Sequence, residues 1–219
     1  MSKCQKPKKT AVAYVRSKIA KMKKGFIFSI DCLITPDYSR SAIQSAINCL
    51  IHEKIIIRAC KGIYFKPTFS HLLEGKPIPP DLNVFIAFLC KRNAETIQLH
   101  GGWACNRLRL SKQVPLIKIF YTSGYSRKLR FINGTVKFIR TKDSRILQHA
   151  GTNVGLAISA LYFLGRKLVD QQIINTIQEQ LTENEYQQLK NCELPIWMKK
   201  SCDIYEVNKI SGNNSWRST

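Results

Sequence analysis

Acidic residues are scarce in this chain. Fourteen Asp and Glu stand against 35 Lys and Arg among 219 residues, which gives a formal net charge of +21. Between residues 75 and 169 the only carboxylates are Asp81, Glu95 and Asp143. A metal-dependent nuclease uses clustered carboxylates, so this spacing argues against one. The excess of cations instead predicts a polyanionic partner, either nucleic acid or an anionic surface.

Other signatures of chemistry are also missing. None of the eight cysteines forms a C-x-x-C pair, and no Cys/His group has zinc spacing, which favours reduced thiols over a metal site. The sequence has no G-x-x-x-x-G-K-[ST] loop and no G-x-G-x-x-G, so no nucleotide cofactor is predicted. Its four histidines are dispersed, as is typical of structural residues. We therefore predict a protein that is not an enzyme and that needs no metal or cofactor.

Long hydrophobic runs are absent as well. The longest strongly apolar helical stretch, Val154 to Leu164, is far shorter than the roughly 18–20 residues that span a bilayer. The first ten residues, MSKCQKPKKT, lack the apolar core of a signal peptide. The expectation is a cytoplasmic protein that does not enter a membrane.

The most informative segment that is present covers residues 26–66. A helix is predicted from Thr10 to Met22 and ends before Gly25, and a short strand follows at 26–28. A turn around Thr35-Pro36-Asp37 leads into an amphipathic helix, and two β-rich runs, 55–60 and 63–66, meet at Lys61-Gly62. This order predicts a winged helix-turn-helix, in which the helix after the turn enters the DNA major groove.

The second helix of this segment can be predicted in detail. Ser39 is a good N-cap, and the apolar residues from Ala42 to Ile51 form one stripe at the helical period. The opposite face is polar and free of carboxylates until Glu53. Such a face also suits a solvated surface helix, but the hairpin and the charge favour DNA. The predicted DNA-contacting residues of helix and wing are Ser39, Arg40, Ser41, Gln44, Ser45, Asn48, Arg58, Lys61 and Lys66.

Charge and proline content predict two domains. Residues 1–70 hold 14 cations and 3 carboxylates, and residues 71–219 hold 21 and 11. The proline-rich stretch Gly75 to Pro80 is typical of a linker. We predict a basic arm (Lys3, Lys6, Lys8, Lys9) and the winged helix in residues 1–70, and a second domain in 71–219 with a mobile tail after about Asn208.

The second domain is predicted to be α+β. Helices are expected at 81–92, 103–110, 152–164 and 169–181, and a further one starts at a Thr182–Glu185 capping box and is ended by Pro195. Strands are expected at 96–99 and 116–122 and on both sides of Asn133-Gly134, a strong hairpin signal. The fold class of the whole chain is therefore α+β: a winged helix followed by a domain with a small, partly antiparallel sheet and terminal helices.

Two stretches together resemble a known family. The winged helix ending in KGIYFKP, and VPLIKIFYTSGYSRKLRFINGTVKFIRT (114–141) with its T-x-G-x-S-R turn and the following AGTNVGLAISALYFLG, resemble AbiEi-type antitoxins of bacterial abortive-infection and type IV toxin–antitoxin systems. The resemblance covers roughly residues 10–190. It implies an N-terminal domain that binds inverted repeats in its own promoter and represses the operon. It also implies a C-terminal domain that counters a toxin of nucleotidyltransferase fold.

The C-terminal functional surface is less defined by motif. Its candidate residues are the cations around the predicted hairpin, Lys118, Arg127, Lys128, Arg130, Lys137 and Arg140. The same cations, with Phe120, Tyr121, Tyr125 and Phe131 nearby, leave open an RNA-binding adaptor that stacks single-stranded bases. The alternative assignment of the aromatics places Phe120 and Phe131 in the core and leaves Tyr125 exposed. A protein-interaction module without a toxin partner is a third possibility.

Overall fold

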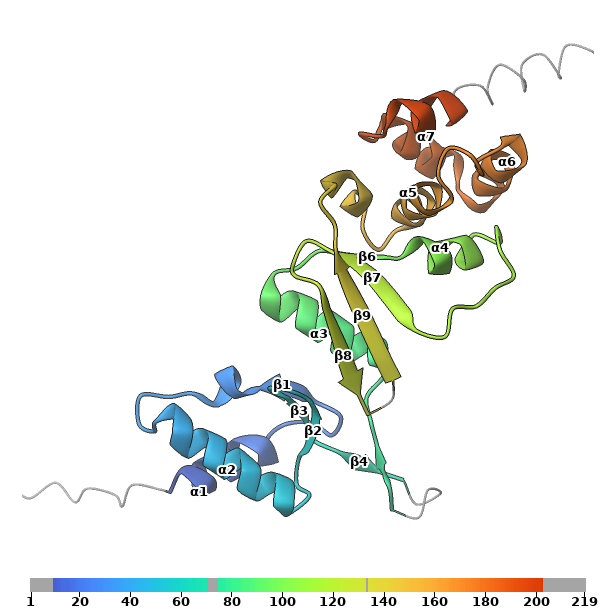
Figure 1. The fold of residues 1–219 in the computed structure, drawn as a ribbon. Helices are drawn as coiled ribbons and strands as arrows, with labels where there is room; N and C mark the ends of the chain where they lie inside the picture. Colours follow the sequence, from blue (N-terminus) through green and yellow to red (C-terminus); the bar gives the residue numbers. More distant parts are fainter. Residues whose placement is uncertain (1–9, 71–74, 133, 203–219) are drawn as a thin grey trace, which may run out of the picture. The chain divides into compact units, whose positions relative to one another are not determined.

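The protein is a mixed α+β chain in a computed structural model that describes residues 10–70, 75–132 and 134–202 (Figure 1). It divides into two compact units. Unit 1 comprises Met1–Leu89 and Arg130–Gly134, and unit 2 comprises Cys90–Leu129 and Thr135–Thr219. The division falls within helix α3 (Leu82–Asn93) and not near residue 70. The reason is that Phe85 of α3 packs on Phe65 and on Phe131, with ring centroids 5.9 and 5.3 Å apart.

Unit 1 combines helices with two small sheets. Its elements before α3 are α1 (Ala11–Ala20), β1 (Ile27–Ser29), the 3₁₀ helix η1 (Ile30–Leu33), α2 (Arg40–His52), β2 (Ile57–Cys60), β3 (Ile63–Phe65), β4 (Thr68–Phe69) and β5 (Pro77–Ile78). One sheet has the order β1-β3-β2 with antiparallel neighbours, in which Tyr64 lies opposite both Phe28 and Arg58. The predicted helices, the short strand after Gly25 and the hairpin are therefore all present (Figure 1).

The core of unit 1 explains why these elements form. Thr10 caps α1, because its side chain accepts from the backbone N–H of Ala13. Val15 and Ile19 of α1 are fully buried, and they share one hydrophobic core with the buried residues of α2. The two helices are thus held together by apolar stripes at the helical period. This packing leaves the opposite face of α2 outside the core.

The proline-rich stretch is not only a linker. Pro77–Ile78 forms strand β5, which pairs antiparallel with Thr68–Phe69 of β4. The sequence predicts only a linker here and no strand. A two-residue edge ladder tolerates a proline, because the missing N–H can face away from the partner strand.

Unit 2 contains most of one four-stranded sheet, of which residues 130–131 and Gly134 are counted with unit 1. Its elements after α3 are β6 (Ile97–Leu99), α4 (Gly101–Arg107), β7 (Lys118–Thr122), β8 (Arg127–Phe131), β9 (Gly134–Arg140), η3 (Ser144–Leu147), α5 (Asn153–Leu164), α6 (Gln171–Gln180) and α7 (Glu183–Asn191). The strand order is β6-β7-β9-β8. β6 pairs antiparallel with β7, and β7 pairs parallel with β9, so the sheet is partly antiparallel as predicted.

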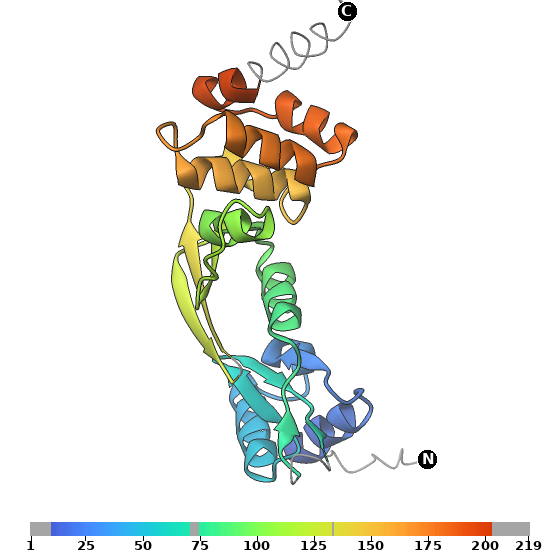
Figure 2. The same ribbon diagram turned by 90° about the vertical axis from the view of Figure 1, so that its right-hand side faces the viewer.

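Helix α5 lies at the centre of the helical part of unit 2 (Figure 2). Thr152 caps its start and Gly165, with φ +70°, ends it, as the sequence predicts. Its eight consecutive residues from Val154 to Leu161 are all buried. The capping box of α7 also forms, since Thr182 and Glu185 exchange hydrogen bonds.

Two helix boundaries differ from the prediction. Helix α4 starts at Gly101 because His100 caps it, with Nδ1 accepting from the N–H of Gly102 at 3.3 Å. Helix α7 ends at Asn191, before Pro195. Residues 196–202 are helical again, and Pro195 begins this segment because its carbonyl accepts from the N–H groups of Met198 and Lys199.

Three predicted features fall on residues that the structure does not describe. The basic arm, the tail after Asn208 and Asn133 of the predicted turn lie outside the described residues. Within the parts of the chain that are described, no helix has the length and apolar character needed to cross a bilayer.

Candidate nucleic-acid interface

Helix α2 begins where the sequence predicts. The Ser39 hydroxyl accepts a hydrogen bond from the backbone N–H of Ala42 at 3.2 Å. In the preceding turn, the Thr35 hydroxyl accepts from the N–H of Asp37 at 3.0 Å. The apolar stripe of α2 is buried in the core of unit 1, so its opposite face is turned to solvent.

The solvent face of α2 is polar. The predicted DNA-contacting residues that it exposes are Arg40, Ser41, Ser45 and Asn48. Gln44 is half-buried, and its amide nitrogen lies 3.3 Å from Asn48 Oδ1 and 3.4 Å from the hydroxyl of the buried Tyr64. Tyr64 thus orients Gln44 from the sheet below. These two contacts use both N–H groups of the Gln44 amide, so Gln44 can accept from a base edge through Oε1 as it stands, and it must release one of the two long contacts to bind an adenine bidentately.

Arg40 is held more weakly. Its Nη1 lies 3.4 Å from Asp31 Oδ1, and the two side chains are 65% and 53% exposed. An ion pair between side chains as exposed as these contributes little stability. Arg40 can therefore exchange Asp31 for a phosphate or a guanine edge at small cost.

The β2–β3 hairpin, which follows α2 in the chain, carries two further cations, Arg58 and Lys61. Lys61 and Gly62 connect the strands, and Gly62 has φ +78°, a left-handed conformation that favours glycine. Lys61 is exposed at the turn, and Arg58 is exposed in β2. Both retain the exposure that a phosphate contact requires.

Lys66 does not fit its predicted role as a DNA contact. Its Nζ donates to three backbone carbonyls at the end of α1, those of Ile19, Ala20 and Met22, at 3.1, 3.0 and 2.9 Å. An ammonium has three donors, so this geometry uses all of them. Lys66 caps the C-terminal end of α1, where orphan carbonyls and the helix dipole favour a cation.

The carboxylate at the end of α2 is also neutralised internally. Glu53 Oε2 lies 2.7 Å from Arg16 Nη2 of α1, and the hydrogen bond from Arg16 lowers the pKa of Glu53. The pair links the C-terminal end of α2 to α1. The charge of Glu53 is thus offset within unit 1 by Arg16.

In unit 2, the T-x-G-x-S-R turn encloses a buried carboxylate. Arg127 Nη1 and Nη2 donate to Glu95 Oε1 and Oε2 at 3.0 and 2.6 Å, and the two side chains are only 9% and 6% exposed. The guanidinium also lies over the rings of Tyr125 and Phe138, at 4.8 and 4.3 Å from their centroids. Arg127 therefore stabilises the fold, and its assignment to an exposed functional surface is wrong.

The rest of the turn serves the same carboxylate. The Thr122 hydroxyl donates to Glu95 Oε2 at 3.2 Å and accepts from the N–H of Gly124 at 3.0 Å. A Cβ on Gly124 would lie 2.5 Å from the carboxyl carbon of Glu95, so glycine is required by the close approach. Ser126 accepts from the backbone N–H of Arg140 in β9 at 2.9 Å. The most specific motif of the sequence is thus explained by structure, not by a ligand.

The remaining cations do not form one patch. Lys128, Arg130, Lys137 and Arg140 are exposed, and Lys118 is half-buried. Because side chains alternate along a strand, Lys137 lies on the face of the sheet opposite to Phe138, whereas Lys118, opposite Val136, lies on the Phe138 side with Arg140. Lys128 follows Arg127 and shares the Lys137 face. Arg130 belongs to unit 1.

The aromatic residues near these cations are mostly internal. Phe120 and Phe131 are 9% and 7% exposed, whereas Tyr125 is 63% exposed. This matches the prediction that the two phenylalanines fill the core. No group of three or more His, Cys, Asp or Glu side chains that could hold a metal occurs among the residues that the structure describes.

The family described as "Family of unknown function (DUF6088)" matches residues 14–189. The match covers α1 through most of α7 and thus parts of both compact units. No curated protein matches the sequence.

Proposed function

The chain belongs to DUF6088, whose description assigns no function, and we propose from its residues that it is a DNA-binding transcriptional regulator. In this proposal, unit 1 is a winged helix-turn-helix. Helix α2 is the recognition helix, and the turn between β2 and β3 is the tip of the wing.

The order of elements supports this assignment. A winged helix-turn-helix needs two packed helices before a hairpin, and α1, α2 and the β2–β3 hairpin follow in that order with β1 completing the sheet. The 3₁₀ helix η1 stands where a longer second helix would be expected. The observation that carries the proposal is the solvent face of α2, polar and free of carboxylates, with Gln44 oriented by Tyr64.

Contacts on this surface would divide by chemistry. Arg40, Ser41, Gln44 and Ser45 lie in the first turns of α2, which in such modules meet the base edges, and Asn48 lies one turn further. Arg and Gln can each bind one base bidentately. Arg58 and Lys61 would contact phosphates, which supply affinity without sequence preference.

The resemblance to AbiEi-type antitoxins extends the proposal. It makes the protein the antitoxin and autorepressor of a type IV toxin–antitoxin operon, with unit 2 countering a nucleotidyltransferase-fold toxin. The T-x-G-x-S-R turn is the most specific part of this resemblance. Its Thr122 and Arg127 side chains bind the buried Glu95 carboxylate, so they are not part of an exposed toxin-related surface. The unit 2 surface in this function is thus one of two cation groups, the exposed Lys128 with Lys137 or the half-buried Lys118 with the exposed Arg140.

The DNA-binding part is tested by fluorescence anisotropy on the full chain. Arg40→Ala and Gln44→Ala should each cost about 1–3 kcal/mol on the upstream duplex and nearly nothing on a scrambled duplex, if these residues read bases. Lys61→Ala should weaken binding to both duplexes equally. Lys91→Ala, an exposed cation of α3, is the control and should change neither. Equal losses on both duplexes for Arg40→Ala and Gln44→Ala would remove α2 as the reading element.

The antitoxin part needs a separate assay. Growth is measured while the full chain is co-expressed with the nucleotidyltransferase-fold toxin that this proposal expects in the same operon. A Gln44→Ala/Lys61→Ala double variant should still restore growth, because DNA binding and neutralisation are assigned to different units. Failure of the wild-type chain to restore growth would contradict the antitoxin role and leave DNA binding intact.

The RNA-adaptor alternative has weaker support. Stacking platforms present several aromatic side chains to successive bases. Of the four aromatics considered for unit 2, only Tyr125 has more than half of its surface exposed, and its ring already lies against Arg127.

A further inference from the structure

Unit 2 contains a pocket of about 690 Å³ that the proposed DNA-binding surface does not use. Its lining residues are Arg145, Arg166, Ile196, Trp197, Lys200 and Ser201. Three of the six are cations and none is a carboxylate. The volume falls within the roughly 300–1,000 Å³ range of small-molecule sites.

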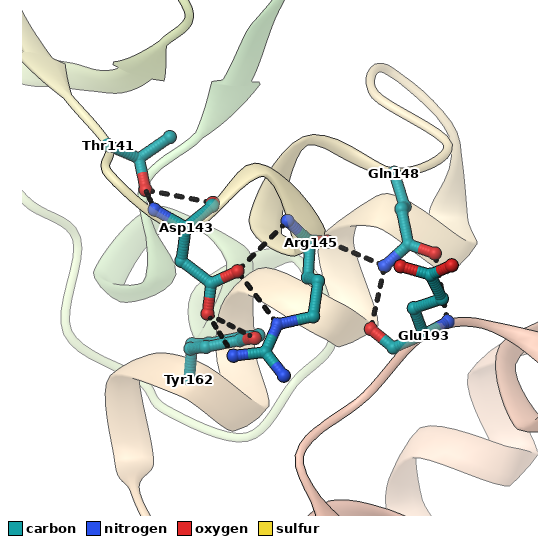
Figure 3. Close-up of polar contacts among 6 residues, drawn as sticks. All are labelled: Thr141, Asp143, Arg145, Gln148, Tyr162 and Glu193. Carbon is teal, nitrogen blue, oxygen red and sulfur yellow. Dashed lines mark hydrogen bonds and ion pairs between the residues drawn. The ribbon is translucent and has the colours of Figure 1, made fainter.

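The guanidinium of Arg145 is held in place by the carboxylate of Asp143, which is not among the lining residues of the pocket (Figure 3). Asp143 accepts from Arg145 Nε at 2.8 Å and from Nη2 at 2.7 Å, and the Tyr162 hydroxyl donates to the same carboxylate at 2.9 Å. Among the described residues, these bonds leave Nη1 of Arg145 without an acceptor. The guanidinium is thus oriented by a carboxylate outside the pocket lining while one donor group remains for a ligand.

The two walls of the pocket are tied together by one amide (Figure 3). Gln148 follows η3, and its Nε2 donates to the carbonyl oxygens of Arg145 and Glu193 at 3.0 and 2.9 Å. Its Oε1 accepts from the N–H of Glu193 at 2.9 Å. Glu193 lies three residues before Ile196, where the helical segment with Trp197 and Lys200 begins. Gln148 therefore fixes this segment relative to Arg145.

The other cations of the pocket are not neutralised by described residues. Arg166 and Lys200 are exposed and form no ion pair with any carboxylate that the structure describes. Of the carboxylates around the pocket, Asp143 is engaged by Arg145, Glu193 is exposed, and Asp170, which lines a neighbouring pocket with Ser201, caps α6. The described lining itself holds three cations and no carboxylate, so it is positively charged.

Trp197 gives the pocket a second chemical character. It is half-buried against the core of unit 2 and lines the pocket beside Ile196. An indole offers a flat surface on which a nucleobase can stack, and Arg and Lys bind phosphate. A lipid headgroup or a bare anion would use the cations but gain little from Trp197.

We infer that this pocket binds a nucleotide phosphate, with the phosphate on Arg145, Arg166 and Lys200 and the base on Trp197. The nucleotide is either free or the 5′-phosphorylated end of a single strand. The site lies within unit 2, so the inference does not depend on duplex-DNA binding by unit 1.

The test uses the full chain. Calorimetry measures AMP, ribose 5-phosphate and inorganic phosphate, and anisotropy measures a 3′-labelled RNA hexamer with and without a 5′-phosphate. The charge variants are Arg166→Gln and Lys200→Gln. Their matched controls are Lys167→Gln and Lys199→Gln, which remove neighbouring exposed cations outside the pocket lining.

We expect each pocket variant to weaken AMP or phosphorylated-hexamer binding tenfold or more, and each control to change it less than twofold. Trp197→Phe should retain binding, and Trp197→Leu should lower AMP affinity to that of ribose 5-phosphate. AMP binding identifies a free nucleotide, and binding of the phosphorylated hexamer alone identifies a strand end. Phosphate binding as tight as AMP, or equal effects of pocket and control variants, would overturn the inference. Upstream-duplex binding by the pocket variants is measured in parallel and should stay within a few-fold of wild type.

Discussion

Replacement of Arg127 by Met should strongly destabilise unit 2. The substitution leaves the Glu95 carboxylate, whose side chain is 6% exposed, without its two charged donors at 3.0 and 2.6 Å. Removing one partner of a buried ion pair costs about 3–5 kcal/mol. The Thr122 hydroxyl and the Asn93 amide still donate to Glu95, at 3.2 and 3.1 Å, so we expect the lower end of that range, about 3 kcal/mol.

Tryptophan fluorescence suits the measurement. Unit 1 contains no tryptophan, whereas Trp103 and Trp197 lie in the described part of unit 2, so a urea titration followed by tryptophan emission reports on unit 2. Lys128→Met is the matched control, because Lys128 is the next residue and is exposed. It should change the free energy of unfolding by less than about 0.5 kcal/mol.

A double variant separates the ion pair from simple packing. Glu95→Leu/Arg127→Met removes both charges, and replacing a buried pair by apolar side chains is often neutral or stabilising. We expect it to be more stable than Arg127→Met alone. If Arg127→Met unfolds like Lys128→Met, or if the double variant loses the sum of both single effects, the buried pair is not what stabilises this turn.

Three further predictions concern other residues. Lys66→Met should destabilise unit 1 by about 1–3 kcal/mol, since charged hydrogen bonds to the carbonyls of α1 are lost, yet leave the DNA affinity of the folded protein unchanged in an anisotropy titration. Hydrogen bonds from Arg145 and Tyr162 lower the pKa of Asp143 to about 2, so its stabilising contribution is present above its usual pKa and is lost as pH falls toward 2. A carboxyl NMR titration should show a higher Asp143 pKa in Tyr162→Phe, and an unchanged value would contradict that cause. Gly101→Ala should cost about 1–3 kcal/mol in thermal or urea unfolding because its Cβ would lie 1.9 Å from Phe163 Cβ, whereas Gly102→Ala, with nothing nearer than 3.8 Å, should be neutral or slightly stabilising.

Local patterns of unit 1 could be predicted well from the sequence. The apolar stripe of α2, its Ser39 cap and the strands around Lys61-Gly62 depend on neighbouring residues, so periodicity and turn chemistry are sufficient. The same holds for the Thr182–Glu185 capping box in unit 2. These features need no information about distant parts of the chain.

The roles of individual cations could not be predicted in this way. Lys66 and Arg127 look like surface charges in the sequence, but their partners are 44 or more residues away for Lys66 and 32 away for Arg127. Only the tertiary fold brings a helix end or a buried carboxylate to them. The pocket of Arg145, Arg166 and Lys200 combines three separate segments for the same reason. One feature of the sequence does point to the partner of Arg127. Glu95 is one of only three carboxylates between residues 75 and 169, so a buried arginine in this stretch has few acidic side chains to pair with.

The central claim is that unit 1 reads a specific duplex. It is tested most directly by the ratio of dissociation constants of the full chain for duplex from upstream of its own gene and for a scrambled duplex, at about 150 mM salt. We predict a preference of 100-fold or more, with both affinities falling as salt rises at a log–log slope near −0.9 per phosphate neutralised. Equal, weak and equally salt-sensitive binding to both duplexes would contradict sequence-specific recognition by α2 and reduce the role of the positive charge to nonspecific attraction.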